Sequence, residues 1–105
     1  MVVVLRREVG DVLRTRRVDL GRTLRDVSAQ AAVSLGYLSE VERGQKEASS
    51  EILASVADAL DVPISTIMRE VGDRISVLEG LHTFSDVVPD DIASLDEVQP
   101  ELSLR

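Results

Sequence analysis

The chain has 105 residues, a formal net charge of −7, 44% apolar residues and 30% charged residues. This is the size of one ordinary domain, with enough apolar residues for a buried core. Because there is no Cys and only one His, disulfides, zinc fingers, iron–sulfur sites and thiol nucleophiles are excluded, and we expect no metal and no cofactor. The apolar run at residues 2–5 is too short for a signal peptide or a membrane span, so we expect a cytoplasmic protein without a membrane partner.

Apolar residues recur at helical spacing along most of the chain, which predicts an all-α bundle of five helices. The expected helices span residues 7–20, 23–31, 35–43, 50–60 and 64–79. Thr23, Ser34 and Ser49 stand where a helix needs an N-cap, and Thr23 forms a weak capping box with Asp26. A glycine follows the first and third helices, where helices commonly end in the left-handed conformation.

The inward-facing residues follow from the helical spacing. They are expected to be Val9, Val12, Leu13 and Leu20 in the first helix, Leu24, Val27 and Ala31 in the second, Leu38 and Val41 in the third, Ile52, Leu53, Val56, Ala57 and Leu60 in the fourth, and Ile64, Ile67 and Met68 in the fifth. Arg17 lies on the same face as Leu13 and Leu20, so it points toward the core. An unpaired buried charge is too costly, and Arg17 therefore needs a partner.

The composition changes after Gly80. Residues 81–105 contain six acidic residues, one arginine and two of the three prolines. We interpret this segment as an acidic, mostly disordered tail, with one short helix near residues 90–98 as an alternative. The folded domain is expected to cover residues 7–80, and the fifth helix is expected to take part in dimerisation.

Two short helices joined by a tight turn at Ala32-Val33 are typical of a helix-turn-helix. The segments LRxxR at 13–17, LGRTL at 20–24, VSLGYLSEVERG at 33–44 and LDVP at 60–63 carry a more specific signal. Over about residues 7–72 the chain resembles the lambda-repressor-like (Cro/CI, XRE) DNA-binding domain, and it looks most similar to ClgR-type regulators of Clp-protease genes in actinobacteria. The resemblance implies a homodimeric transcriptional activator of protease or stress genes. We expect no enzyme, because the only histidine is His82 and the sequence has no phosphate-binding loop of the P-loop type. Ala32 and Ala48 depart from the Gly and Pro that the family often has.

Residues at the start of the third helix are candidates for reading bases, because the N-terminal end of the second helix of the motif reaches base edges in the major groove. Leu35 suits a thymine methyl group, Gly36 permits close approach, Tyr37 offers a ring and a hydroxyl, and Glu40 suits cytosine N4, with Ser39 on the same turn. For Leu35 and Tyr37 the alternative is that they are partly buried and only brace the helix.

Further residues are candidates for contacts with the DNA backbone, since helix N-termini and nearby cations bind phosphate. They are Arg22, Thr23, Arg25, Ser34, Arg43, Gln45 and Lys46. The alternative is a purely structural cap for Thr23 and Ser34, and a solvated side chain for the cations. For Arg17, the family resemblance and the helix phase both indicate Glu42 as the partner in a structural ion pair between the first and third helices.

One helix-turn-helix unit reads about half of a site, so a two-fold operator in double-stranded DNA calls for a homodimer. The fifth helix offers an apolar stripe that extends past the expected core, and exposed apolar stripes usually mark interfaces. The expected interface residues are Met68, Val71, Gly72, Ile75 and Leu78. The alternative is that the tail folds back over this stripe.

Charge is distributed unevenly along the chain. Residues 1–46 have a net charge of +3 and residues 47–105 a net charge of −10. Because charges farther apart than about 8 Å are largely screened at physiological salt, the acidic part need not cancel a basic DNA-binding part. Two other uses of the tail stay open: an antitoxin-like module that engages a basic partner, and a contact with RNA polymerase.

Overall fold

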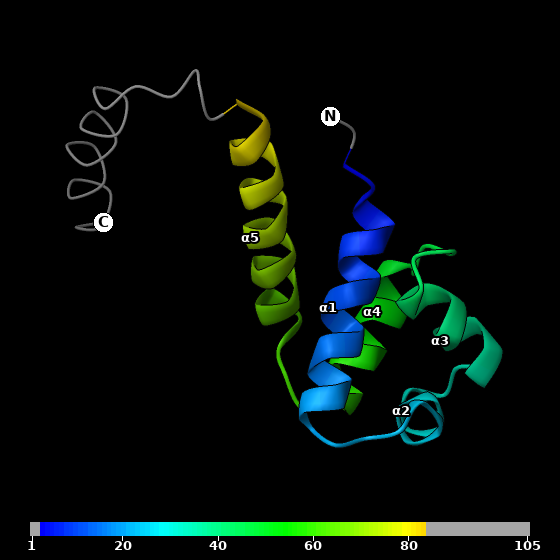
Figure 1. The fold of residues 1–105 in the computed structure, drawn as a ribbon. Coiled ribbons are helices and arrows are strands. Elements are labelled where there is room, and N and C mark those ends of the chain that lie inside the picture. The colour runs from blue at the N-terminus through cyan, green and yellow to red at the C-terminus, as the bar shows by residue number, and fades with distance from the viewer. Residues whose placement is uncertain (1–2, 84–105) are drawn as a thin grey trace, which may run out of the picture.

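The computed structural model describes residues 3–83, and within that range it contains five helices and no strand (Figure 1). The helices are α1 (Leu5–Asp19), α2 (Leu24–Ala31), α3 (Leu35–Glu42), α4 (Ser50–Ala59) and α5 (Ile64–Thr83). The all-α fold predicted from the spacing of apolar residues is therefore confirmed. In the part of the chain that the structure describes, no helix combines the length and the apolar character needed to cross a membrane.

Helix α1 is central to the bundle, because it packs against both α5 and α3. Helix α2 packs against α3 and α4, and α4 in turn contacts α5. Helices α1 and α5 run side by side in opposite directions (Figure 1), and the ion pairs Arg16–Glu70 and Arg74–Asp11 join them. The largest fully buried side chains are Val12, Leu13, Val27, Leu38, Val41, Val56, Leu60 and Ile67. Burial of each such side chain contributes about 1.5–3 kcal/mol, so this core drives the folding of all five helices together.

The prediction that Leu20 faces the core is wrong. Its side chain is 46% exposed. The last helical residue of α1 is Asp19, and Leu20 is the C-cap, followed by Gly21 with φ 71°. The chain leaves the helix direction at this point, so helical spacing no longer determines where Leu20 points.

The structure also corrects which side of α5 is buried. Val71, expected to be exposed, is 4% exposed, whereas Ile64 and Met68, expected to close the bundle, are 38% and 42% exposed. Val71 lies one turn after the fully buried Ile67 and therefore shares its face. Because α1 begins at Leu5 and supports α5 over several turns, the core continues to Val71 instead of ending at Met68.

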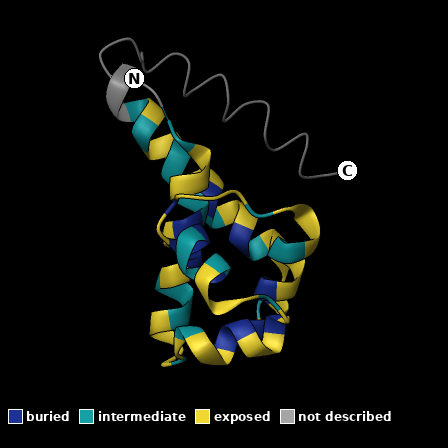
Figure 2. Cartoon of the chain, turned by 90° about the vertical axis from the view of Figure 1, so that its right-hand side faces the viewer, coloured by how far each residue is buried: buried dark blue, intermediate teal, exposed yellow. Residues whose placement is uncertain are grey.

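Helix α5 is longer than expected, because it continues through Gly80 to Thr83. The expected domain boundary at residue 80 therefore lies inside a helix. From Gly72 to Gly80 no residue is buried, and Figure 2 shows this part of α5 projecting from the bundle. The expectations for the acidic tail beyond Thr83, including a short helix near residues 90–98, fall on residues outside the described range.

Candidate nucleic-acid interface

The N-terminal end of α3 is open to solvent. Ser34 caps it, because the Ser34 hydroxyl accepts a hydrogen bond from the Tyr37 amide at 3.1 Å. Leu35 is 36% exposed, and a Cβ atom added to Gly36 would meet no atom within 4 Å. Free backbone N–H groups at a helix start attract anions, and a glycine without neighbours allows close approach. This end of α3 can therefore receive a nucleic-acid strand or a base edge.

The opposite side of α3 is fixed to α1 by a bidentate ion pair. Arg17 Nε donates to Glu42 Oε2 at 2.8 Å, and Arg17 Nη2 donates to Glu42 Oε1 at 3.0 Å. A third bond runs from Arg17 Nη1 to the Arg22 carbonyl at 3.0 Å. The side chains are only 15% and 6% exposed, and the hydrogen bonds with Glu42 raise the pKa of Arg17 above its usual value. Arg17 therefore stays charged, and the bidentate pair holds the orientation of α3.

Sequence reasoning missed the close contact between α1 and α3 at Gly10. A Cβ atom at this position would lie 2.7 Å from the Glu42 carbonyl oxygen and closer still to that of Val41. Only glycine lets the two helix backbones approach this closely. An isolated glycine inside a helical pattern was the available signal, since it lowers helix propensity and so calls for a packing reason.

Helix α2 begins with a complete capping box. Thr23 Oγ1 accepts from the Asp26 amide at 3.0 Å, and Asp26 Oδ2 accepts from the Thr23 amide at 3.2 Å. These bonds lower the pKa of Asp26. The turn that follows α2 places Ala32 in the left-handed conformation, with φ 58°. The left-handed conformation explains why glycine, which adopts it without strain, is often found at this turn in the family. Ala32 adopts the same conformation at a steric cost.

Tyr37 braces α3 against the loop that follows it. Its side chain is half-buried and packs against the core, and its hydroxyl donates to the Glu47 carbonyl at 2.9 Å. In the protein without DNA, Tyr37 therefore braces the helix, which is the alternative that the sequence left open beside a base contact. A contact between Tyr37 and a base stays a prediction.

Arg22, a candidate for phosphate contact, makes several bonds within the protein. Its Nη1 donates to Gln30 Oε1 at 3.0 Å and to the carbonyl of Ala59, the last residue of α4. Its Nη2 pairs with Asp61 Oδ2 at 2.6 Å. A phosphate would have to compete with these acceptors for the guanidinium group.

The polar residues at the end of α3 satisfy one another. Arg43 Nη1 donates to Ser39 Oγ at 3.0 Å, and Arg43 Nη2 donates to Gln45 Oε1 at 3.2 Å. Lys46 Nζ lies 3.6 Å from Glu40 Oε1. Because these are exposed pairs and contribute little stability, their cations remain available to DNA.

Arg25 differs from its neighbours, because among the described residues its guanidinium group makes no hydrogen bond or ion pair, and only its backbone carbonyl accepts a hydrogen bond from the Ser28 hydroxyl. It lies beside an open hollow of about 450 Å³ on the outer side of α2, with Arg22, Asp26, Ala29 and Gln30. An unpaired guanidinium near the start of a helix suits a phosphate group. Within residues 3–83, no cluster of three or more His, Cys, Asp or Glu residues is arranged to hold a metal ion.

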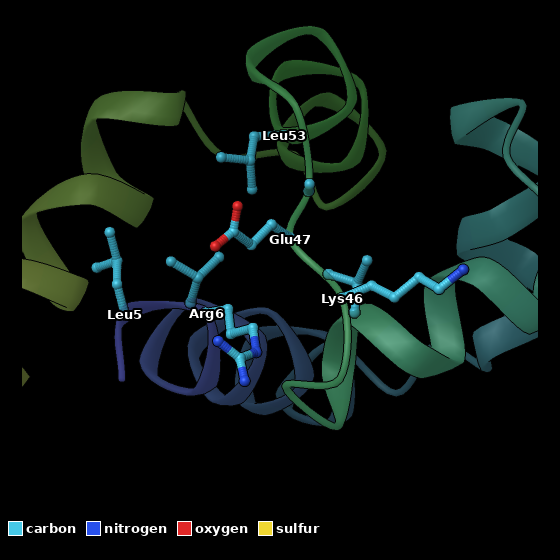
Figure 3. Close-up of a pocket in the computed structure, with 8 residues that line it drawn as sticks. Leu5, Arg6, Lys46, Glu47 and Leu53 are labelled. Atoms are coloured by element: carbon cyan, nitrogen blue, oxygen red, sulfur yellow. The ribbon is translucent and has the colours of Figure 1, made fainter. Parts of the chain in front are cut away.

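A second hollow lies on the far side of α3, between α1, α4 and the loop at residues 45–48 (Figure 3). Its volume is about 190 Å³, below the roughly 300–1,000 Å³ of ordinary small-molecule sites. Figure 3 shows the Glu47 side chain reaching across it toward Leu53, while Lys46 points away. The hollow is therefore a poor site for an effector.

Comparisons with known proteins agree with this geometry. The helix-turn-helix family HTH_3 matches residues 13–67. The transcriptional regulator ClgR of Mycobacterium tuberculosis is 52% identical over 81 residues, which cover 77% of this chain and 72% of that protein. The crystal structure of the clp gene regulator ClgR from Corynebacterium glutamicum has 40% identity and a TM-score of 0.70, covering 78% of this chain and 87% of that chain.

A more distant structure shows the fold alone. The restriction-modification controller protein C.Esp1396I, solved as a tetramer on its natural 35-base-pair operator, has 21% identity and a TM-score of 0.57, covering 64% of this chain and 93% of that chain. The family match and the two ClgR relatives decide the classification. The chain therefore belongs to the XRE-type helix-turn-helix family, as a DNA-binding transcriptional regulator of the ClgR type.

Proposed function

We propose that this regulator binds a two-fold-symmetric operator in double-stranded DNA as a homodimer, with the N-terminal end of α3 in the major groove. The observation that carries the proposal is the open surface at Leu35 and Gly36, on a helix whose other side is fixed by the Arg17–Glu42 pair. A rigid helix with one open end is what specific base contacts require, since small shifts would remove them.

The contacts divide into two kinds. Leu35 and Gly36 approach base edges, with Ser39 and Glu40 one turn further along the helix. Thr23 and Ser34, which cap α2 and α3, stand at helix starts that receive phosphate groups. Arg25, Arg43 and Lys46 supply positive charge beside these helix starts, and such contacts position the protein without reading sequence.

The proposed dimer interface differs from the expected one in one residue of α5: the exposed Ile64 takes the place of the buried Val71. Ile64 and Met68 are exposed, Ile75 is half-exposed, and a Cβ atom on Gly72 would meet no atom within 4 Å. These four residues recur at helical spacing on one side of α5. We include the half-exposed Leu78 and exclude the buried Val71. Ile75 packs partly against the core, and the rest of this apolar flank stays largely exposed within the described chain, which is typical of an association surface.

The name of a relative supports a proposal for the target genes. The Corynebacterium glutamicum protein is a clp gene regulator, so we propose clp genes as targets. We also propose activation through contact with RNA polymerase, which rests on the resemblance to ClgR-type regulators alone. The controller protein on its operator gives a precedent within the same fold for several subunits on one duplex.

Selection of bound sequences from random duplex DNA at fixed salt tests the operator proposal. We expect enrichment of a two-fold-symmetric sequence whose half-sites are about 34 Å apart, one helical turn. No enrichment contradicts DNA reading, and enrichment of a single half-site contradicts the dimer. Transcription from the selected site with purified RNA polymerase tests activation, and a fall in transcript would contradict it.

Sedimentation of two matched variants tests the interface. Met68→Asp places a charge on the proposed flank and is expected to produce a monomer. Val77→Asp is the control, because Val77 is also exposed, at 61%, but lies on the opposite side of α5. Loss of the dimer in Val77→Asp but not in Met68→Asp would move the interface to the other flank.

A further inference from the structure

Arg22 is hydrogen-bonded directly to α1, α2 and α4, and it is linked to α3 through Arg17. Its guanidinium group reaches Gln30 in the last turn of α2 and the carbonyl of Ala59 at the end of α4. Its own backbone carbonyl accepts a hydrogen bond from Arg17 of α1. Arg17 in turn holds Glu42 of α3 in the bidentate pair. No other described residue has hydrogen bonds to this combination of partners.

The arrangement uses the shape of the guanidinium group as well as its charge. One nitrogen, Nη1, is shared between Gln30 and the Ala59 carbonyl, while Nη2 pairs with Asp61 at 2.6 Å. A planar fork with several donors can bridge acceptors in different directions, whereas a lysine ammonium is a compact point charge on a flexible stem. A cation near the last carbonyls of α4 also suits the negative end of that helix.

The surroundings of Arg22 favour an internal role over a contact with DNA. Its side chain is 28% exposed, and its acceptors lie on α2, on α4 and in the α4–α5 turn. Arg25, three residues later, is exposed and free of such bonds, so it offers a phosphate a cation without first breaking protein contacts. Of the two arginines beside this hollow, Arg22 is therefore bound to other parts of the protein, whereas Arg25 is open to a phosphate group.

We infer that Arg22 is a positioning residue for sequence reading: it fixes α2 against the end of α4 and thereby sets the angle at which α3 enters the DNA. It is not a phosphate ligand. This inference rests on the proposed DNA binding. It separates the geometry of the reading unit from the positive charge that attracts DNA.

The decisive variant is Arg22→Lys in the full chain, compared with Arg25→Ala. Lysine keeps the charge at position 22, but its single ammonium nitrogen cannot hold Gln30, the Ala59 carbonyl and Asp61 together as the two terminal nitrogens of Arg22 do. We expect Arg22→Lys to weaken binding to the selected operator by about tenfold or more, with unchanged affinity for non-operator duplex and an unchanged salt dependence. Arg25→Ala is expected to weaken both kinds of binding and to lower the salt slope by about 1.

Three results would overturn the inference. Retained operator affinity in Arg22→Lys would show that only the charge matters, as for a phosphate ligand. An Arg22→Ala variant that loses about one unit of salt slope would show the same. If the loss of operator affinity were fully explained by the fraction of each variant that is unfolded, Arg22 would contribute to stability only. Binding is therefore measured well below the unfolding midpoint of each variant.

A second measurement does not use DNA. Residual dipolar couplings of the free, full-length protein report the angle between α2 and α4, and we expect that angle to change in Arg22→Lys and to be preserved in Arg25→Ala. An unchanged angle would contradict the inference. If the unmodified protein selects no sequence at all, the proposed function fails, and the angle alone then decides the role of Arg22.

Discussion

Gly10, which lies against α3, and Gly36, which lies on α3, differ in how closely other atoms surround them. A Cβ atom at Gly10, where α1 meets α3, would lie 2.7 Å from the Glu42 carbonyl oxygen, whereas one at Gly36 would meet no atom within 4 Å. Gly10 of α1 lets the backbones of α1 and α3 touch inside the protein. Gly36 leaves space on the outer surface of α3. The inner side of α3 is thus committed to the fold, and the outer end is free for a ligand.

The largest effect is expected where charge is buried on the inner side. Glu42→Ala leaves Arg17, only 15% exposed, without its carboxylate partner, so we expect the free energy of unfolding to fall by about 3 kcal/mol. Chemical denaturation measures this. Glu40→Ala is the matched control on the outer side, where an exposed pair with Lys46 at 3.6 Å contributes about 0–1 kcal/mol. Equal losses in the two variants would contradict the contrast.

The next effect concerns Gly10. In Gly10→Ala the added methyl group forces α1 and α3 apart, and we expect a loss of about 1–3 kcal/mol in unfolding free energy, as for overpacked cores. Gly80→Ala is the control, because it lies in α5 with nothing within 4 Å of an added Cβ. It is expected to be neutral or stabilising. An unchanged melting temperature in Gly10→Ala would show that the close contact is not present in solution.

Gly36→Ala separates stability from binding. Alanine favours a helix by up to about 1 kcal/mol over glycine and meets no protein atom here, so the free protein should be as stable or more stable. In the complex the methyl group would stand between α3 and the DNA, and we expect operator affinity to fall about tenfold. Titration of the selected duplex measures this. Unchanged affinity would remove Gly36 from the interface.

A smaller gain in stability is expected at the turn between α2 and α3. Ala32 has φ 58°, which costs an L-residue about 1–2 kcal/mol and glycine almost nothing. Because glycine also makes the unfolded chain more flexible, Ala32→Gly should stabilise the protein by less than about 1 kcal/mol. A thermal midpoint that falls in Ala32→Gly would show that the left-handed turn is absent.

The smallest effect is the acid sensitivity of the α2 cap. Hydrogen bonds from Thr23 lower the pKa of Asp26. Since the folded-state pKa is lowered, the contribution of the cap is present above the unfolded-state value, about 3.9, and is lost as pH falls through the folded-state value. An NMR titration of the Asp26 carboxyl carbon should show this low pKa. Thr23→Ala keeps the backbone N–H that donates to Asp26 Oδ2, so it should raise the pKa only part of the way toward its ordinary value. An ordinary pKa of Asp26 in the unmodified protein would contradict the capping box.

Sequence patterns predicted the features that depend on neighbours in the chain. Thr23 and Asp26 are three residues apart, so the capping box follows directly from residue types. That Arg17 needs a partner followed from its inward-facing position, and the family resemblance together with helix phase indicated Glu42, which the structure confirms. Apolar spacing and caps also predicted the ends of α1 to α4 to within two residues, whereas α5 continues four residues past its predicted end.

Features that depend on how helices cross were not predictable in the same way. The apolar stripe of α5 is wider than the core it covers, so the sequence could not tell that Val71 is buried and Met68 exposed. The bonds of Arg22 to Ala59 and Asp61 join residues far apart in the chain, and no local pattern indicates them. A lone arginine after Gly21 is equally consistent with a phosphate contact and with an internal one.

The most direct test of the central claim is to follow the amide signals of the full-length protein by NMR while adding the selected operator duplex. The account predicts that shifts concentrate at the starts of α2 and α3, around Thr23 and at Ser34–Gly36, and in the residues 43–46 after α3. The amides where Gly10 meets α3 should change little, because that side is closed. Shifts concentrated along α4 or α5, with Ser34–Gly36 unaffected, would contradict it.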